Sequence, residues 1–300
     1  MRGEIVKAPR SAYLHIPFCH KRCFYCDFAV IPLGNSAQGG IGPGIDSIKS
    51  YLNLLCREIS ISPLGPPLST IYIGGGTPSL LNPEQISFLL SCLREKFGVQ
   101  SGAEITMEID PATFTKKDLG DYLTIGINRL SLGGQSFNNA VLNEIGRTHN
   151  KDQLLEACNW LKEMHKHRRL SSWSLDLIQN LPGENMDRWE QQLKLAVNSY
   201  APHLSIYDLS VEPGTVFASK YKKGQLNLPN DDLAAEINSF TSLYLSDAGY
   251  SRYEISSYCL PGFASRHNRM YWSGSGWWGF GMSATSSPWG QRFARPKKIS

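Results

Sequence analysis

The sequence predicts an α/β protein in which a parallel β-sheet is covered by helices. Short runs of β-branched and aliphatic residues alternate regularly with longer amphipathic stretches along the chain. Parallel strands need crossover connections, and the amphipathic stretches are long enough to be helical crossovers. Chemically unusual residues also follow the expected strands repeatedly, which is typical of a site built from many loops.

The alternation gives six strand–helix units, and the sequence contains no internal repeat. We expect strands at residues 13–16, 70–73, 104–109, 129–132, 174–178 and 203–209. We expect helices at residues 45–59, 83–97, 116–123, 138–145, 151–166, 185–199 and 231–248. Asn82, Thr115 and Asn150 directly precede three of these helices and are typical N-cap residues. Six such units form an open sheet or a partial barrel, and both bind ligands at the carboxyl ends of the strands.

Composition excludes several classes of protein. The 300 residues are 41% hydrophobic and 19% charged, which favours a buried core over disorder. The net charge of +4 is matched by four basic residues near the C-terminus alone, so we expect no nucleic-acid partner. No stretch of about 18 apolar residues occurs, so we expect no transmembrane segment. Residues 1–10 lack the apolar region of a secretory signal.

Seven cysteines are present, and three of them, Cys19, Cys23 and Cys26, lie within eight residues. An odd count with this clustering does not fit a secreted disulfide framework. We interpret the other four as ordinary thiols in a reducing compartment: Cys56, Cys92, Cys158 and Cys259.

The three clustered cysteines can direct their thiolates at one inorganic centre. A closed zinc site needs a fourth ligand, for which His15 or His20 is available. A cubane iron–sulfur cluster held by three thiolates leaves one iron open to another ligand. The spacing favours the cluster, while structural zinc and coincidental burial remain the alternatives.

A glycine triplet follows the second expected strand, in the sequence Gly-Gly-Gly-Thr-Pro-Ser at residues 74–79. Glycines at a strand end allow close backbone approach and positive φ. The triplet is neither a phosphate loop nor a dinucleotide fingerprint, because the required following residues are absent. A tight turn is the simpler interpretation, but it rarely needs three glycines.

These motifs together resemble the radical S-adenosylmethionine enzymes, and more closely the oxygen-independent coproporphyrinogen III oxidase-like family. The cysteine triplet is preceded by Tyr-Leu-His-Ile-Pro-Phe at residues 13–18. Further motifs match in the same order at residues 74–79, 108–111, 129–137, 146–149, 176–178, 181–183, 212–215 and 253–256.

The resemblance implies a partial (β/α)6 barrel whose first loop binds a 4Fe-4S cluster through Cys19, Cys23 and Cys26. S-adenosylmethionine would bind the open iron, and its one-electron cleavage would give a 5′-deoxyadenosyl radical. By position, the resemblance assigns cofactor contacts to Tyr13, Gly75 and Glu108. It assigns a second, neighbouring cofactor site to Tyr25, Gly76, Thr77, Gln135, Arg147 and Asp176. Taken singly, Glu108 and Asp176 are also interpretable as strand-end caps.

Within this family the resemblance distinguishes two functions. The oxidases carry a fourth cysteine two residues after the third, whereas this chain has Phe28 there. The segment His-Asn-Arg-Met-Tyr-Trp at residues 267–272 is similar to the haem-binding segment of the haem chaperone branch, which assigns His267 to haem. The hypothesis is therefore a chaperone that binds haem and delivers it to acceptor haemoproteins, with an electron donor for the cluster. The alternatives are an oxidoreductase that decarboxylates coproporphyrinogen III and a fold in which His267 only caps a turn.

The resemblance also predicts the domain organisation. We expect a core barrel over residues 1–250, with residues 251–300 starting the connection to a helical C-terminal domain that is truncated in this chain. We expect a cytoplasmic protein, or one of an organellar matrix if a transit peptide precedes this sequence.

Overall fold

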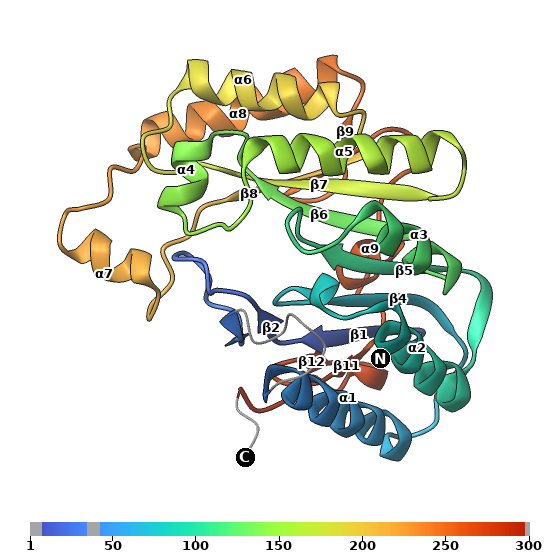
Figure 1. The fold of residues 1–300 in the computed structure, drawn as a ribbon. Helices are drawn as coiled ribbons and strands as arrows, with labels where there is room; N and C mark the ends of the chain where they lie inside the picture. Colours follow the sequence, from blue (N-terminus) through green and yellow to red (C-terminus); the bar gives the residue numbers. More distant parts are fainter. Residues whose placement is uncertain (1–7, 35–42, 298–300) are drawn as a thin grey trace, which may run out of the picture.

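The computed structural model describes residues 8–34 and 43–297, which form one curved sheet with helices along its outside. Nine strands follow in the spatial order β11-β1-β4-β5-β6-β7-β8-β10-β9 (Figure 1). Every pair from β11 to β8 is parallel, and β10 and β9 continue the sheet in antiparallel pairing. The bounds of the nine strands are β1 Ser11–Ile16, β4 Leu68–Gly75, β5 Val99–Ile109, β6 Arg129–Gln135, β7 Ser172–Gln179, β8 His203–Asp208, β9 Ser251–Arg252, β10 Ser257–Cys259 and β11 Trp278–Phe280.

Among the helices, α1 and α2 pack on the outer, apolar face of the sheet near β1 and β4, and α6 and α8 pack there near β7 and β8, whereas α7 lies apart from the sheet (Figure 1). Their bounds are α1 Pro43–Ile61, α2 Pro83–Phe97, α3 Lys116–Thr124, α4 Asn139–Glu144, α5 Lys151–Lys166, α6 Met186–Asn198, α7 Val216–Lys222, α8 Asp231–Asp247 and α9 Arg266–Trp272. The short elements are β2 Phe18–Cys19, β3 Ile31–Pro32, β12 Thr285–Ser286, β13 Phe293–Ala294, η2 Pro78–Leu80 and η3 Pro288–Gly290. The expected partial (β/α)6 barrel is confirmed.

Three predicted helix starts are confirmed in atomic detail. Asn82, Thr115 and Asn150 each accept a hydrogen bond from the third backbone N–H of their helix. The side chain at that third position returns a bond to the cap residue, which completes a capping box. Each box satisfies two N–H groups that the helix itself leaves unpaired.

The strands alternate apolar residues toward the helices with polar residues toward the barrel interior. On β6, Leu130 and Leu132 are fully buried in the outer core, whereas Arg129 and Ser131 face inward. Barrels of this type are usually filled by branched aliphatic side chains. A polar interior therefore leaves room and hydrogen-bonding groups for ligands.

The part of the chain beyond the predicted boundary at residue 250 contributes to the same sheet. β10 pairs with β8 on one side, and β11 pairs with β1 on the other. Helix α9 lies near the amino-terminal ends of β4 and β5, where Glu104 accepts hydrogen bonds from the backbone of Arg266 and His267. The boundary itself stays a prediction.

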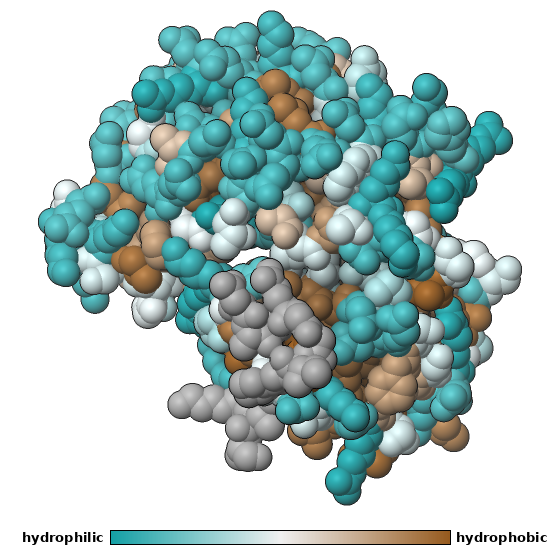
Figure 2. All heavy atoms as spheres, in the orientation of Figure 1, coloured by the Kyte–Doolittle hydropathy of each residue, from teal (hydrophilic) through white to brown (hydrophobic). Residues whose placement is uncertain are grey.

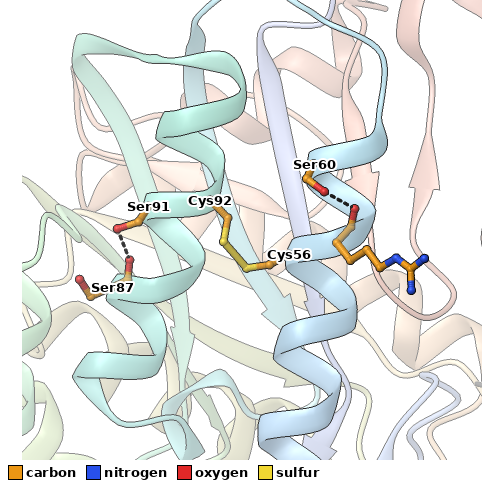
Figure 3. The surroundings of a disulfide bond; sticks show 6 residues. Cys56, Ser60, Ser87, Ser91 and Cys92 are labelled. Carbon is orange, nitrogen blue, oxygen red and sulfur yellow. Dashed lines mark hydrogen bonds between the residues drawn. A yellow bond between two sulfur atoms is a disulfide. The ribbon is translucent and has the colours of Figure 1, made fainter.

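One expectation about the cysteines is wrong. Cys56 on α1 and Cys92 on α2 are not ordinary thiols but form a disulfide, with their Cα atoms 5.8 Å apart (Figure 3). The bond joins two neighbouring helices of the outer layer and closes a segment that contains β4. Cys158 and Cys259 are buried free thiols, as expected.

Candidate functional site: two cavities in the barrel

The larger cavity has a volume of about 420 Å³ and lies where the carboxyl ends of the parallel strands meet. On the face shown in Figure 2, the surface is mainly hydrophilic and is hollowed between the α7 region and the body of the molecule. All the residues predicted for the cluster and for S-adenosylmethionine line this upper cavity, with the exception of Tyr13: Cys19, Cys23, Tyr25, Cys26, Gly75, Gly76, Thr77, Glu108, Gln135, Arg147 and Asp176.

The cysteine loop leaves β2 and borders this cavity. Cys19 is buried, and Cys23 and Cys26, which are half-buried, are joined by a turn in which the Cys26 N–H donates to the Cys23 carbonyl. Burial raises the pKa of Cys19 to about 12, with smaller contributions from Cys26 and Cys23, and burial also raises the pKa of Cys26. The Cys19 and Cys26 thiols are therefore protonated until a metal centre displaces their protons.

The fit of an iron–sulfur cluster rests on this donor set. Within the described residues, no group of three or more His, Cys, Asp or Glu side chains is already gathered closely enough to hold a metal ion. Three free thiols on one cavity wall nevertheless supply the soft ligands that iron–sulfur clusters take. Of the two candidate fourth ligands for zinc, His15 is engaged elsewhere, because its ring nitrogens hydrogen-bond to Tyr13 and to the Ala29 carbonyl. His20 lines the same cavity and hydrogen-bonds through Nδ1 to the Gly34 carbonyl.

The glycine triplet packs directly against the chain that leads to Cys19. The Gly76 N–H donates to the Ile16 carbonyl and the Thr77 N–H to the Phe18 carbonyl, each at 2.7 Å. A Cβ on Gly76 would lie 2.6 Å from the Phe18 oxygen, and Gly75 has φ 120°. These glycines are therefore required for close contact with the neighbouring backbone, in addition to the ligand approach expected from the sequence.

Two half-buried carboxylates face the interior at mid-barrel. Glu108 accepts hydrogen bonds from the Tyr72 hydroxyl at 3.0 Å and from the Gly75 N–H at 2.9 Å. Burial outweighs these bonds and raises the pKa of Glu108 to about 7. Asp176 accepts from Ser131 and Ser174, and burial raises its pKa too. Both groups can therefore change protonation state when a charged ligand arrives.

Arg147 is held against the cysteine loop by a residue absent from the predicted site. Its guanidinium pairs with Asp110, donates to the Gly133 carbonyl at 2.8 Å and lies 3.7 Å from the Cys23 sulfur. Burial alone would raise the pKa of Asp110, but Arg147 and His149 lower it to about 2. Asp110 is two residues after Glu108. Because side chains two residues apart along a strand point to the same face, this spacing indicates in the sequence that both residues face the site.

Tyr13 and His267 do not reach the upper cavity. They line a second, lower cavity of about 290 Å³ toward the amino-terminal ends of the strands, together with Arg129, Tyr207 and Trp272. Tyr13 donates to His15 and stacks on Tyr72. Glu108, Ser131 and Tyr207 line both cavities, so the two lie on either side of the mid-barrel.

His267 is 2% exposed, and both its ring nitrogens have partners. Nδ1 is 2.8 Å from the Thr70 hydroxyl, and Nε2 is 3.0 Å from the Tyr271 hydroxyl. Burial, with a smaller contribution from Arg129, lowers the pKa of His267 to about 3. The imidazole is therefore neutral at physiological pH.

Comparison with known proteins agrees with the architecture. The sequence profile of the radical SAM superfamily matches residues 13–196. The heme chaperone HemW of Synechocystis is 39% identical over 293 residues, which cover 96% of this chain and 68% of that protein. HemW of Escherichia coli is 36% identical over 276 residues, which cover 92% of this chain and 69% of that protein. The chain belongs to the HemW family of radical SAM proteins.

A solved structure extends this comparison to the fold. The coproporphyrinogen III oxidase HemN from Escherichia coli, described as a radical SAM enzyme, superimposes with a TM-score of 0.80 at 26% identity. The match covers 99% of this chain and 68% of that protein. Membership of the radical SAM superfamily implies a 4Fe-4S cluster and S-adenosylmethionine, for which the upper cavity offers the residues described above. No helix among the described residues is long and apolar enough to span a membrane.

Proposed function

We propose that this HemW-family protein binds haem and delivers it to acceptor haemoproteins. The proposal rests on the residue at the second position after Cys26, which is a phenylalanine and not a cysteine. Phe28 stands there with its side chain 57% exposed at the wall of the upper cavity, so the loop offers three thiols and no fourth. Identities of 36–39% to proteins named heme chaperones, against 26% to the oxidase, support the same choice.

In this proposal the upper cavity holds the cofactors. Cys19, Cys23 and Cys26 bind the cluster, which supplies one-electron chemistry and an iron site for S-adenosylmethionine. Arg147 positions the loop through its contact with Cys23. Glu108, held by a hydrogen bond from the Gly75 N–H, places a carboxylate on the cavity wall, where it can accept hydrogen bonds from an amino group of the cofactor.

Haem is placed at the lower cavity in the proposal, with His267 as its candidate iron ligand. A neutral imidazole suits iron, and burial keeps His267 neutral. Ligation at Nε2 requires that His267 exchange its hydrogen bond with Tyr271 for the metal. The proposal also includes an electron donor for the cluster and a location in the cytoplasm or an organellar matrix.

The test is a pair of assays on one anaerobically reconstituted sample. Hemin titration should give a saturable Soret shift, and reduced coproporphyrinogen III should yield no protoporphyrinogen. Absence of the Soret shift would overturn the proposal, and product formation would establish the oxidase alternative, which the HemN-like fold favours.

The iron ligand is tested separately with His267→Ala. This variant should lose the ligation spectrum, whereas His167→Ala, which removes an exposed histidine at the end of α5, should keep it. Identical spectra for His267→Ala and the wild type would rule out His267 as the ligand.

A further inference from the structure

Arg129 is a buried cation that lacks a partner. It begins β6, is 4% exposed and faces the lower cavity. Across the part of the chain that the structure describes, its guanidinium forms no ion pair or hydrogen bond, and its Nε is buried and unsatisfied. Burying a charge without a partner costs free energy, so we expect a bound ligand to supply the missing partner.

The acidic side chains around the lower cavity do not fill that role. Glu108 is engaged by Tyr72 and the Gly75 N–H, and Glu254, on the cavity wall, is not within ion-pair distance of Arg129. Asp176, at mid-barrel, is engaged by two serine hydroxyls and lies beyond ion-pair distance of Arg129, whose charge partly offsets the rise in the pKa of Asp176. Burial keeps the histidines of this cavity, His203 and His267, in their neutral forms by lowering their pKa values. The positive charge of Arg129 is therefore available to an anionic ligand.

The wall of the same cavity carries exposed aromatic surface. Trp272 is 57% exposed and Tyr207 is 47% exposed, and both line the cavity. A volume of about 290 Å³ is at the small end of the range for ligand pockets, so a carboxylate arm and part of a planar ring fit inside while the rest of the ring extends along the aromatic wall. This combination fits a flat apolar molecule that carries an acidic side arm.

We propose that Arg129 binds a propionate carboxylate of haem, with the macrocycle lying against the aromatic wall that includes Tyr207 and Trp272. The inference rests on the proposed haem-binding function and deepens it. A guanidinium binds a carboxylate through two parallel hydrogen bonds, and a buried site strengthens such a pair. Arg129 then sets the orientation of the haem edge that enters the barrel.

The test compares hemin with hemin dimethyl ester, in which both propionates are neutral. Wild-type protein should bind hemin about 10- to 100-fold more tightly than the ester, as a charged hydrogen-bonded pair predicts. Arg129→Gln should bind both at the affinity of the ester. Arg57→Gln, which removes an exposed arginine on α1 outside both cavities, should keep the wild-type ratio.

Two further measurements keep the outcomes distinct. Arg129→Gln should be at least as stable as the wild type toward urea without ligand, because it removes an unpaired buried charge; a clear loss of stability would assign Arg129 a structural role and overturn the inference. S-adenosylmethionine affinity should be unchanged, and a loss there would assign the guanidinium to that cofactor instead. An unchanged hemin-to-ester ratio in Arg129→Gln overturns this inference alone, whereas no hemin binding by wild-type protein overturns the proposed function as well.

Discussion

Glu108→Gln tests the electrostatics of the mid-barrel. Burial raises the pKa of Glu108 from 4.5 to about 7, a difference of about 2.5 pH units. At 1.36 kcal/mol per unit this amounts to about 3 kcal/mol. Because the carboxylate borders both cavities, where water can enter, this figure is an upper value.

The direction in which the free energy of unfolding changes with pH follows from proton binding. Between pH 4.5 and pH 7 the unfolded chain has lost this proton while the folded chain keeps it, so stability falls as pH rises through that window. Above about pH 7 both states are ionised and the contribution is constant. Glutamine does not titrate, so the advantage of Glu108→Gln over the wild type should grow by up to about 2.5 kcal/mol between pH 5 and pH 8.

The assay is urea unfolding of the cofactor-free protein at a series of pH values, with the free energy of unfolding extrapolated to water. Glu236→Gln, which changes an exposed glutamate on α8, is the control and should differ from the wild type by the same amount at every pH. A Glu108→Gln difference that stays constant from pH 5 to pH 8 would refute the assignment of a raised pKa to this carboxyl.

Three further predictions concern the cysteines and the glycine triplet. Cys23→Ala should lose most of its iron and labile sulfide after anaerobic reconstitution, because two thiolates hold a cluster poorly, whereas Cys158→Ala should retain both. Cys92→Ser should lower the free energy of unfolding under oxidising conditions by about 4 kcal/mol, the loop-closure value for a separation of 36 residues. Dithiothreitol should bring the wild type to the same level, and an equal effect of reductant on the variant would contradict this. Gly76→Ala should lose about 1–3 kcal/mol in urea unfolding because its Cβ meets a backbone carbonyl. Gly120→Ala in α3, whose Cβ would make only an ordinary contact with the Arg169 side chain, should not be destabilised.

The long elements and the position of the upper cavity were predictable from the sequence. The bounds of the long helices follow almost to the residue from the period of each amphipathic stretch. The N-caps mark three of the helix starts, at Asn82, Thr115 and Asn150. Parallel strands then bring their carboxyl ends to one edge, so residues that follow six different strands converge there.

Depth within the barrel was not predictable in the same way. Tyr13 and Glu108 both point inward, but only the stagger of neighbouring strands decides that Tyr13 faces the lower cavity while Glu108 borders both. The Cys56–Cys92 bond depends on which faces of two helices meet, and β9 to β13 are too short to show a period. Arg129 is one inward residue among many in the sequence, and its lack of a partner is visible only in three dimensions.

The pairing of β1 has a consequence for how the protein is made. β1, which leads into the cysteine loop, is hydrogen-bonded on one side to β4 and on the other to β11 at residues 278–280. During synthesis from the N-terminus, one side of β1 stays open until residues 278–280 have left the ribosome. The strand that leads to the cluster ligands is thus completed late in folding, and its open edge is accessible until β11 closes it.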